Sequence, residues 1–131
     1  MAGADYGYSK QLGAVSFEEA MARVTEALKQ EGFGVLTEID VQATLKKKLD
    51  VDMPRYTILG ACNPKLANRA IDVEPEIGLL LPCNVVIRET AEGMLVSIAN
   101  PKAMFGVVQA AELESVAVEA DERLGRVIAS L

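Results

Sequence analysis

Two cysteines, each beside an asparagine and a proline, are the residues of this chain best suited to chemistry. Cys62 precedes Asn63 and Pro64 at the end of an apolar segment typical of a strand. A cysteine just before a helix can have a lowered pKa, because unpaired N–H groups and the helix dipole stabilise the thiolate. Cys62 is therefore a candidate catalytic nucleophile. Cys83, which follows Pro82 at the start of another strand-like segment, is the candidate resolving thiol.

The sequence leaves three interpretations of this cysteine pair open. Free cysteine is among the most buried residue types, so both residues can be ordinary core positions. A redox or sulfur-handling pair is the second interpretation. The third is a pair of ligand-binding thiols, which together with Met94 or Met104 could hold a soft ion such as Cu(I). A zinc site is not expected, because two thiols need two further ligands and the chain has no histidine. Our prediction is no metal and no cofactor.

Two asparagines and one arginine complete the candidate ligand site. Asn63 is a good N-cap for a helix with proline at its first position, and Asn84 can satisfy a nearby turn. Arg88 alternates with Asn84 on the strand face opposite Cys83, where both could bind an anionic group or form surface ion pairs. The predicted ligand-binding residues are Cys62, Asn63, Cys83, Asn84 and Arg88. We expect the two Cys-Asn pairs to come together in space.

Composition excludes several classes of function. The 131 residues carry a net charge of −6, whereas proteins that bind nucleic acid normally present a basic patch. The absence of histidine removes the Ser-His-Asp triad and the usual general base. No apolar segment approaches the ~20 residues that cross a membrane. Residues 1–8 lack the features of a signal peptide, so we expect a cytoplasmic protein with reduced thiols.

A regular alternation of strands and helices is predicted to position the cysteines. Ser16 and Glu19 form a capping box at the start of one long amphipathic helix, and the C-terminal segment forms a second. Strands are expected at residues 6–12, 33–39, 56–61, within an apolar run at 79–90, and at 94–99. Long helices are expected at 16–31 and 111–131, with short helices after Asp40 and Asn63. Residues 72–78 are predicted to form a loop.

This order of elements favours one α+β domain over residues 1–131. The apolar stripes of the two long helices need a common surface, which an antiparallel sheet supplies on one face. The expected fold therefore has two layers, with short helices inserted between strands. A mean hydropathy of +0.20 is high for a chain of 14.0 kDa, and this predicts a homodimer that hides apolar surface.

Two segments on either side of the cysteines resemble the signature of the DUF302 family, a group of bacterial and archaeal domains of unknown function. They are residues 60–67 (GACNPKLA) and 74–86 (EPEIGLLLPCNVV). The resemblance extends over residues 6–131. It implies a β-α-β4-α core, similar in layout to the TATA-binding-protein-like and helix-grip folds, and a dimer. The family carries no established reaction, so the resemblance implies a fold and not a mechanism.

Three functions are consistent with these features. The favoured hypothesis is a small homodimeric ligand-binding or sensing domain, because the chain is apolar and has no catalytic constellation. An apolar groove between the last helix and the sheet would suit a small molecule. The second hypothesis is a thiol-dependent enzyme or sulfur carrier that uses Cys62 with Cys83. The third is an interaction module without chemistry. Whether the protein is an enzyme is left open by the sequence.

Overall fold

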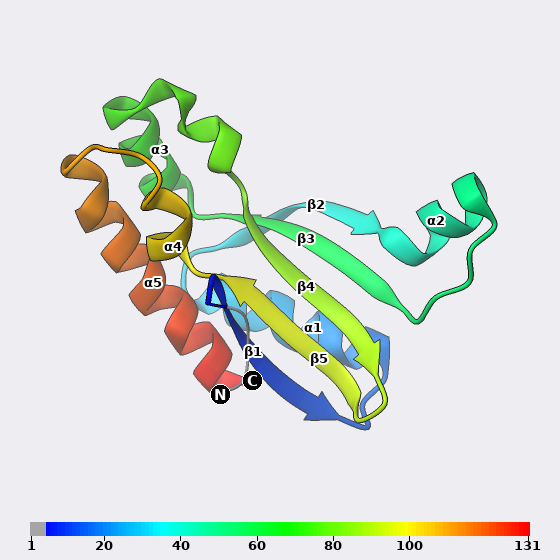
Figure 1. The fold of residues 1–131 in the computed structure, drawn as a ribbon. Coiled ribbons are helices and arrows are strands. Elements are labelled where there is room, and N and C mark those ends of the chain that lie inside the picture. The colour runs from blue at the N-terminus through cyan, green and yellow to red at the C-terminus, as the bar shows by residue number, and fades with distance from the viewer. Residues whose placement is uncertain (1–4) are drawn as a thin grey trace.

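A five-stranded sheet, antiparallel throughout, forms one layer of the protein in the computed structural model, which describes residues 5–131 (Figure 1). The strands are β1 (Gly7–Gly13), β2 (Gly34–Asp40), β3 (Tyr56–Cys62), β4 (Cys83–Thr90) and β5 (Gly93–Ala99). Their order across the sheet is β1-β5-β4-β3-β2, so β1 and β2 are the edges. The signal-peptide prediction concerned residues 1–8, of which residues 1–4 lie outside the described residues.

Two long helices cover one face of this sheet. They are α1 (Phe17–Gln30) and α5 (Glu112–Ser130). The Ser16 hydroxyl accepts a hydrogen bond from the Glu19 amide at 3.0 Å, so the predicted N-cap of α1 is present. Leu28 of α1 and Leu124 of α5 are fully buried in one core with alternate residues of the central strands. Those strand residues are Leu59, Ala61, Val85, Ile87, Val96 and Ile98. The predicted α+β fold, with both long helices on one face of an antiparallel sheet, is confirmed.

Three short helices and one 3₁₀ helix occupy the connections. They are α2 (Val41–Leu49), α3 (Pro64–Val73), the 3₁₀ helix η1 (Pro75–Leu80) and α4 (Pro101–Phe105). Figure 1 shows that α2 projects from one end of the sheet while α3 and η1 project from the other. Within the described residues, no helix is long and apolar enough to cross a membrane.

The structure corrects the prediction at residues 72–80. The expected loop is mostly η1, because Pro75 occupies its first turn and the Glu74 carboxylate accepts from the Glu76 amide at 2.9 Å. Leu79 was predicted to begin a buried run, but its side chain is 81% exposed because η1 stands away from the sheet. The helix α4 was not predicted from the sequence.

Candidate functional site

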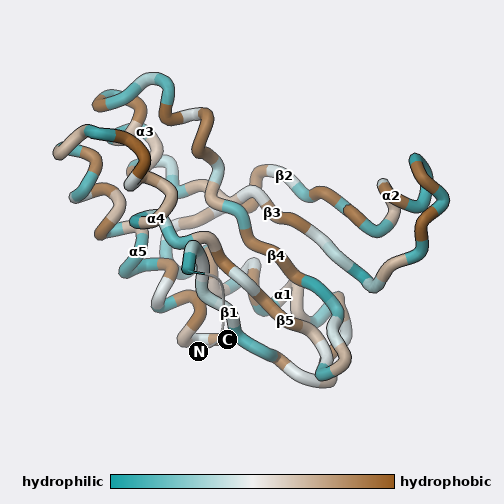
Figure 2. Tube along the Cα trace, in the orientation of Figure 1, coloured by the Kyte–Doolittle hydropathy of each residue, from teal (hydrophilic) through white to brown (hydrophobic). Residues whose placement is uncertain are grey.

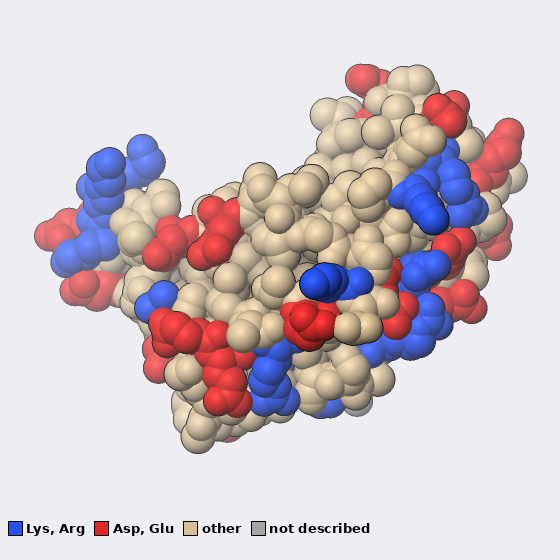
Figure 3. All heavy atoms as spheres, turned by 180° about the vertical axis from the view of Figure 1, so that it is seen from behind, with Lys and Arg blue, Asp and Glu red and all other residues tan. Residues whose placement is uncertain are grey.

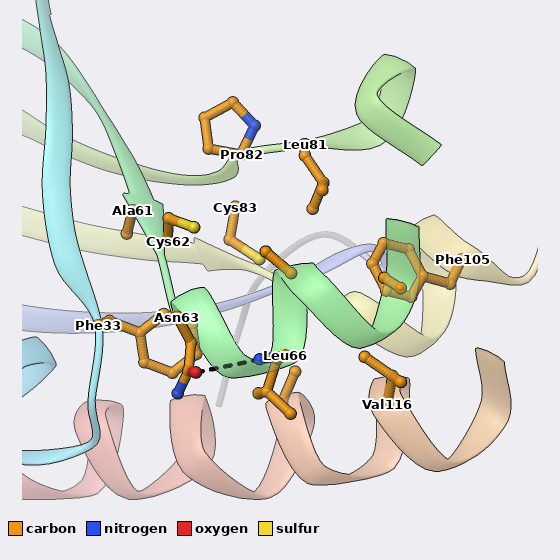
Figure 4. A pocket seen from close by; sticks show the side chains of 13 residues that line it. Phe33, Ala61, Cys62, Asn63, Leu66, Leu81, Pro82, Cys83, Phe105 and Val116 are labelled. Carbon is orange, nitrogen blue, oxygen red and sulfur yellow. Dashed lines mark hydrogen bonds between the residues drawn. The ribbon is translucent and has the colours of Figure 1, made fainter. Parts of the chain in front are cut away.

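The pairing of β3 with β4 brings the two cysteines to one end of the sheet. Ala61 is the register partner of Cys83, so Cys62 and Cys83 belong to adjacent strands. Both side chains are partly buried and both line the same small cavity, together with Asn63 (Figure 4). The sulfur of Cys62 points toward Cys83 in this view. The cavity volume is about 30 Å³.

A glycine and a proline set the position of Cys83. The Leu81–Pro82 peptide is cis, and the Pro82 ring lies against Gly60 of β3. A Cβ added at Gly60 would lie 2.8 Å from Pro82 Cγ and 2.3 Å from Thr37 Oγ1. Only glycine therefore allows these neighbours at this point of β3. Because Pro82 packs closely on Gly60 of β3, the next residue, Cys83, is in position to begin β4 beside β3.

Asn63 is the polar anchor of the site. Its Oδ1 accepts a hydrogen bond from the Leu66 amide at 3.2 Å, which caps α3 as the sequence predicted. Its Nδ2 donates to the carbonyl oxygen of Glu31 at 3.4 Å. Glu31 is the C-cap of α1, and its carboxylate also pairs with Arg126 of α5 at 3.0 Å. Asn63 thus connects α3 to a junction of the two long helices.

The protonation of both thiols differs from what the helix-dipole argument predicted. Burial raises the pKa of Cys62, and it raises the pKa of Cys83 to about 11, with a further contribution from the nearby Cys62. The expected lowering at Cys62 is therefore wrong. The physical reason is that removal from water disfavours the thiolate, while Asn63 already satisfies the amide of Leu66 at the start of α3. Both cysteines are neutral thiols at neutral pH.

Asn84 and Arg88 lie away from this cavity. Cys83, Val85 and Ile87 face the helices, whereas Asn84 is exposed on the other face of the sheet. Arg88 follows on that same open face and pairs in register with Tyr56 and Leu95. Arg88 is four positions along the strand from Asn84, which is a distance of roughly 13 Å. The structure therefore brings together Cys62, Asn63 and Cys83, and places Asn84 and Arg88 elsewhere.

Much of the remaining wall of the cavity is apolar and comes from three helices. This part is formed by Leu66 and Ala70 of α3, Phe105 of α4, and Val116 and Ala120 of α5. Phe105 was not among the predicted site residues, because α4 was not predicted. A signal was available, since Asn100 caps α4 and Pro101 takes its first position, as Asn63 and Pro64 do for α3.

A second, larger hollow adjoins the cavity between α4 and α5. Its volume is about 390 Å³, within the range of small-molecule pockets. Its lining is mainly apolar, with Lys102 and Glu114 as its charged residues. Phe105 lines both the hollow and the cysteine cavity and so forms a wall between them. The sequence predicted an apolar groove between the last helix and the sheet, whereas this hollow lies between α4 and α5 and no strand residue of the described chain lines it.

One further polar cluster joins β1, α4 and α5. The Tyr8 hydroxyl donates a short hydrogen bond to Asp121 Oδ1, and Lys102 Nζ lies 3.7 Å from Asp121 Oδ2. The hydrogen bond to Asp121, with burial, raises the pKa of Tyr8 to about 12. Asp121 is only 17% exposed, so the phenol and the ammonium group are its compensating partners. This cluster fixes the first strand to the last helix.

The chemistry available to the cysteine cavity follows from its donor set. Among residues 5–131, no three side chains of histidine, cysteine, aspartate or glutamate group together to hold a metal. The cavity instead offers two soft sulfur atoms within a hydrocarbon wall. Such a site suits a small species that binds sulfur, and the raised pKa values disfavour a thiolate nucleophile at neutral pH.

Comparison with known proteins identifies relatives over nearly the whole chain. The family model described as Domain of unknown function DUF302 matches residues 8–131. An uncharacterized protein of Aquifex aeolicus (strain VF5) is 23% identical over 125 residues, covering 92% of this chain and 81% of that protein. The crystal structure of an uncharacterized conserved protein DUF302 from Bacillus stearothermophilus is 28% identical with a TM-score of 0.88. That match covers 97% of this chain and 98% of the crystallised one.

Proposed function

The chain belongs to the DUF302 family, whose description names no activity, and we propose its function from its own cavity. The protein is a small ligand-binding or sensing domain, and its ligand occupies the space between Cys62 and Cys83. One observation carries this proposal: two neutral thiols from adjacent strands line a single apolar cavity. Asn63 holds the helix that closes one side of it.

The size of the cavity limits the ligand to a very small species. Its volume of about 30 Å³ is far below the roughly 300–1,000 Å³ of a pocket that holds a metabolite. Sulfur donors prefer soft ions, so the ligand class we propose is a soft monovalent ion such as Cu(I). Binding of Cu(I) would deprotonate the two thiols and release their protons, so the affinity for Cu(I) should increase as the pH rises. This replaces the expectation, from the sequence, that no metal is bound.

Anaerobic titration with Cu(I) against a coloured competing chelator tests the proposal. The wild-type protein should bind one ion per chain, and Cys62→Ser and Cys83→Ser should each lose that binding. Asn84→Ala is the matched control, because Asn84 lies outside the cavity lining, and it should bind as the wild type does. Equal Cu(I) binding by the wild type and the double serine variant would overturn the assignment.

A redox thiol pair is the second candidate function, and the same adjacency of β3 and β4 favours it. Oxidation with diamide would remove two electrons and two protons from the thiols and join Cys62 to Cys83. Peptide mapping by mass spectrometry should then detect the linked peptide, and its return to free thiols with dithiothreitol. Against this function stand the raised pKa values, which slow thiolate attack at neutral pH.

Both candidate functions require reduced thiols at rest. A reducing compartment such as the cytoplasm supplies that condition, and we propose this location for the protein. We also retain the homodimer as a proposal, supported by the mean hydropathy of +0.20. The third hypothesis, an interaction module, receives support from exposed apolar side chains at both ends of the sheet.

A further inference from the structure

The hollow between α4 and α5 is large enough for a small organic molecule and takes no part in the proposed Cu(I) site. Its volume is about 390 Å³, whereas that of the cysteine cavity is about 30 Å³. Phe105 is buried and stands between the two spaces. Figure 1 shows α4 lying beside α5. A ligand in this hollow would therefore be separate from an ion held by Cys62 and Cys83.

The walls of the hollow are apolar on both sides. On the side of α5 they are formed by Leu113, Ala117 and Val118, of which the first two are buried. Gly106 and Ala110, in the connection from α4 to α5, also line the hollow, and their small size leaves space that larger side chains would fill. Figure 2 shows hydrophobic chain in α4 and in this connection. Such walls favour a ligand with a hydrocarbon body.

Lys102 brings an ammonium group to one end of the hollow. Its Nζ lies 3.7 Å from Asp121 Oδ2, so this ammonium is level with Asp121 along α5. Asp121 also accepts the hydrogen bond of Tyr8, which fixes the carboxylate. A separation of 3.7 Å is too long for a hydrogen bond, so the N–H donors of Lys102 are available to a ligand. This end of the hollow therefore suits a carboxylate.

Glu114 brings a carboxylate to the other end of the hollow. Over residues 5–131, its side chain enters no ion pair within 4.0 Å. Glu114, Ala117, Val118 and Asp121 follow one another along one face of α5. Glu114 precedes Asp121 by two helical turns, which is roughly 10 Å along the helix axis. The charges of Glu114 and Lys102 are thus separated along the hollow, with apolar wall between them.

We propose that this hollow binds a small molecule with an ammonium group at one end, a carboxylate at the other and a short hydrocarbon chain between them. The ligand carboxylate pairs with Lys102, the ligand ammonium pairs with Glu114, and the chain lies on Ala117 and Val118. A ligand with a single charge leaves one end of the hollow without a partner. A very short zwitterion such as glycine does not reach both ends. An ω-amino acid of intermediate length satisfies the charges and the apolar wall together.

The field of the whole molecule does not by itself favour such a ligand. The net charge of −6 attracts any cation, but it gives no preference for a molecule whose own net charge is zero. Figure 3 shows Lys and Arg side chains near Asp and Glu ones on the face that it draws, so that face presents no extended patch of one sign. Charges farther away than about 8 Å are largely screened at physiological salt. Tighter binding of a zwitterion than of an amine would therefore report local charges of both signs.

Three probes of equal chain length test which charges the hollow recognises. They are δ-aminovalerate, which carries both charges, valerate, which carries only the carboxylate, and pentylamine, which carries only the ammonium group. NMR titration of isotope-labelled protein measures the Kd of each probe, and the amides that shift locate the site. δ-Aminovalerate should bind about fivefold more tightly than either of the other two, the upper range for one exposed ion pair. The shifts should concentrate in α4 and the first turns of α5, and glycine should produce none there.

Two variants of similar shape assign the ends of the hollow. Lys102→Met should weaken δ-aminovalerate and valerate about fivefold each and leave pentylamine unchanged. Glu114→Gln should weaken δ-aminovalerate and pentylamine by the same factor and leave valerate unchanged. Glu112→Gln is the matched control, because Glu112 lies in the same first turn of α5 but outside the lining. It should bind all three probes as the wild type does. Circular dichroism confirms that each variant is folded.

Several results would overturn this assignment. They are equal affinity of the wild type for the three probes, amide shifts confined to another part of the protein, and a variant that weakens all three probes alike. Lys102→Met removes a partner of Asp121, and if it fails to fold, Glu114→Gln with its control still decides the outcome. The inference goes beyond the proposed function and does not rest on it. None of these variants changes a thiol, so each should still bind Cu(I), and failure of one proposal is distinguishable from failure of the other.

Discussion

Ala61 of β3 and Cys83 of β4 face one another in the antiparallel ladder, and this single pairing creates the candidate site. Residues 21 positions apart in sequence, Cys62 and Cys83, therefore contribute to one cavity through neighbouring strands. The helix α3 and η1 fill the connection between them and bring apolar side chains over the sulfur atoms. The environment of the thiols is set by this connection as much as by the strands.

The raised pKa of Cys83 predicts a loss of stability at alkaline pH. A thiol whose pKa is higher in the folded state binds its proton more tightly there, so folding is favoured below the unfolded pKa. The stabilisation that the protonated Cys83 thiol gives the folded state is complete below about pH 9 and is lost as the pH rises toward 11. Urea unfolding over this range should show a falling free energy of unfolding for the wild type and a weaker fall for Cys83→Ala. Equal slopes for the two proteins would contradict the assignment.

Asn63→Ala should lower the free energy of unfolding by about 1 kcal/mol, the usual effect of removing a helix N-cap. The variant loses the bond from the Leu66 amide and the donor to the Glu31 carbonyl. Asn63→Asp keeps the acceptor for the cap and should recover most of the loss. Asn84→Ala changes an exposed asparagine on β4, and should stay within about 0.5 kcal/mol of the wild type. Chemical denaturation of all four proteins gives the comparison.

Tyr8→Phe should destabilise the fold by about 1.5 kcal/mol, in the range for a hydrogen bond to a charged group. The substitution leaves the partly buried Asp121 carboxylate with Lys102 at 3.7 Å as its remaining partner among those described. Tyr6→Phe is the control, because Tyr6 is 67% exposed and should behave as the wild type does. Thermal unfolding followed by circular dichroism measures both. The prediction fails if the two variants have the same midpoint.

Gly93→Ala should strongly destabilise the hairpin of β4 and β5, because Gly93 is its one glycine and lies against β1. Gly93 has φ of 112°, and an added Cβ would lie 2.0 Å from the carbonyl oxygen of Gly13. The backbone of β5 or β1 must move to accept it, and we expect a loss of about 3 kcal/mol or more from strain and overpacking. Gly78→Ala meets no atom within 4 Å and serves as the matched control. Expression level and unfolding midpoint of the pair would reveal the difference.

The elements of this protein could be predicted because their signals are local. The capping box of Ser16 and Glu19, the apolar stripes of α1 and α5, and the Asn63-Pro64 start of α3 each depend on residues within one or two turns. Local periodicity also indicates which side of a strand is buried, so Cys83 was assigned to one face and Arg88 to the other. These patterns were sufficient for the α+β class and for both long helices on one face.

Tertiary structure alone decided the environment of each candidate residue. The sequence could propose that Cys62 and Cys83 meet, but the pairing of Ala61 with Cys83 depends on register between distant strands. Desolvation depends on everything that packs around a group. Here burial raises the pKa of Cys62, whereas its position before a helix N-terminus would by itself lower that pKa.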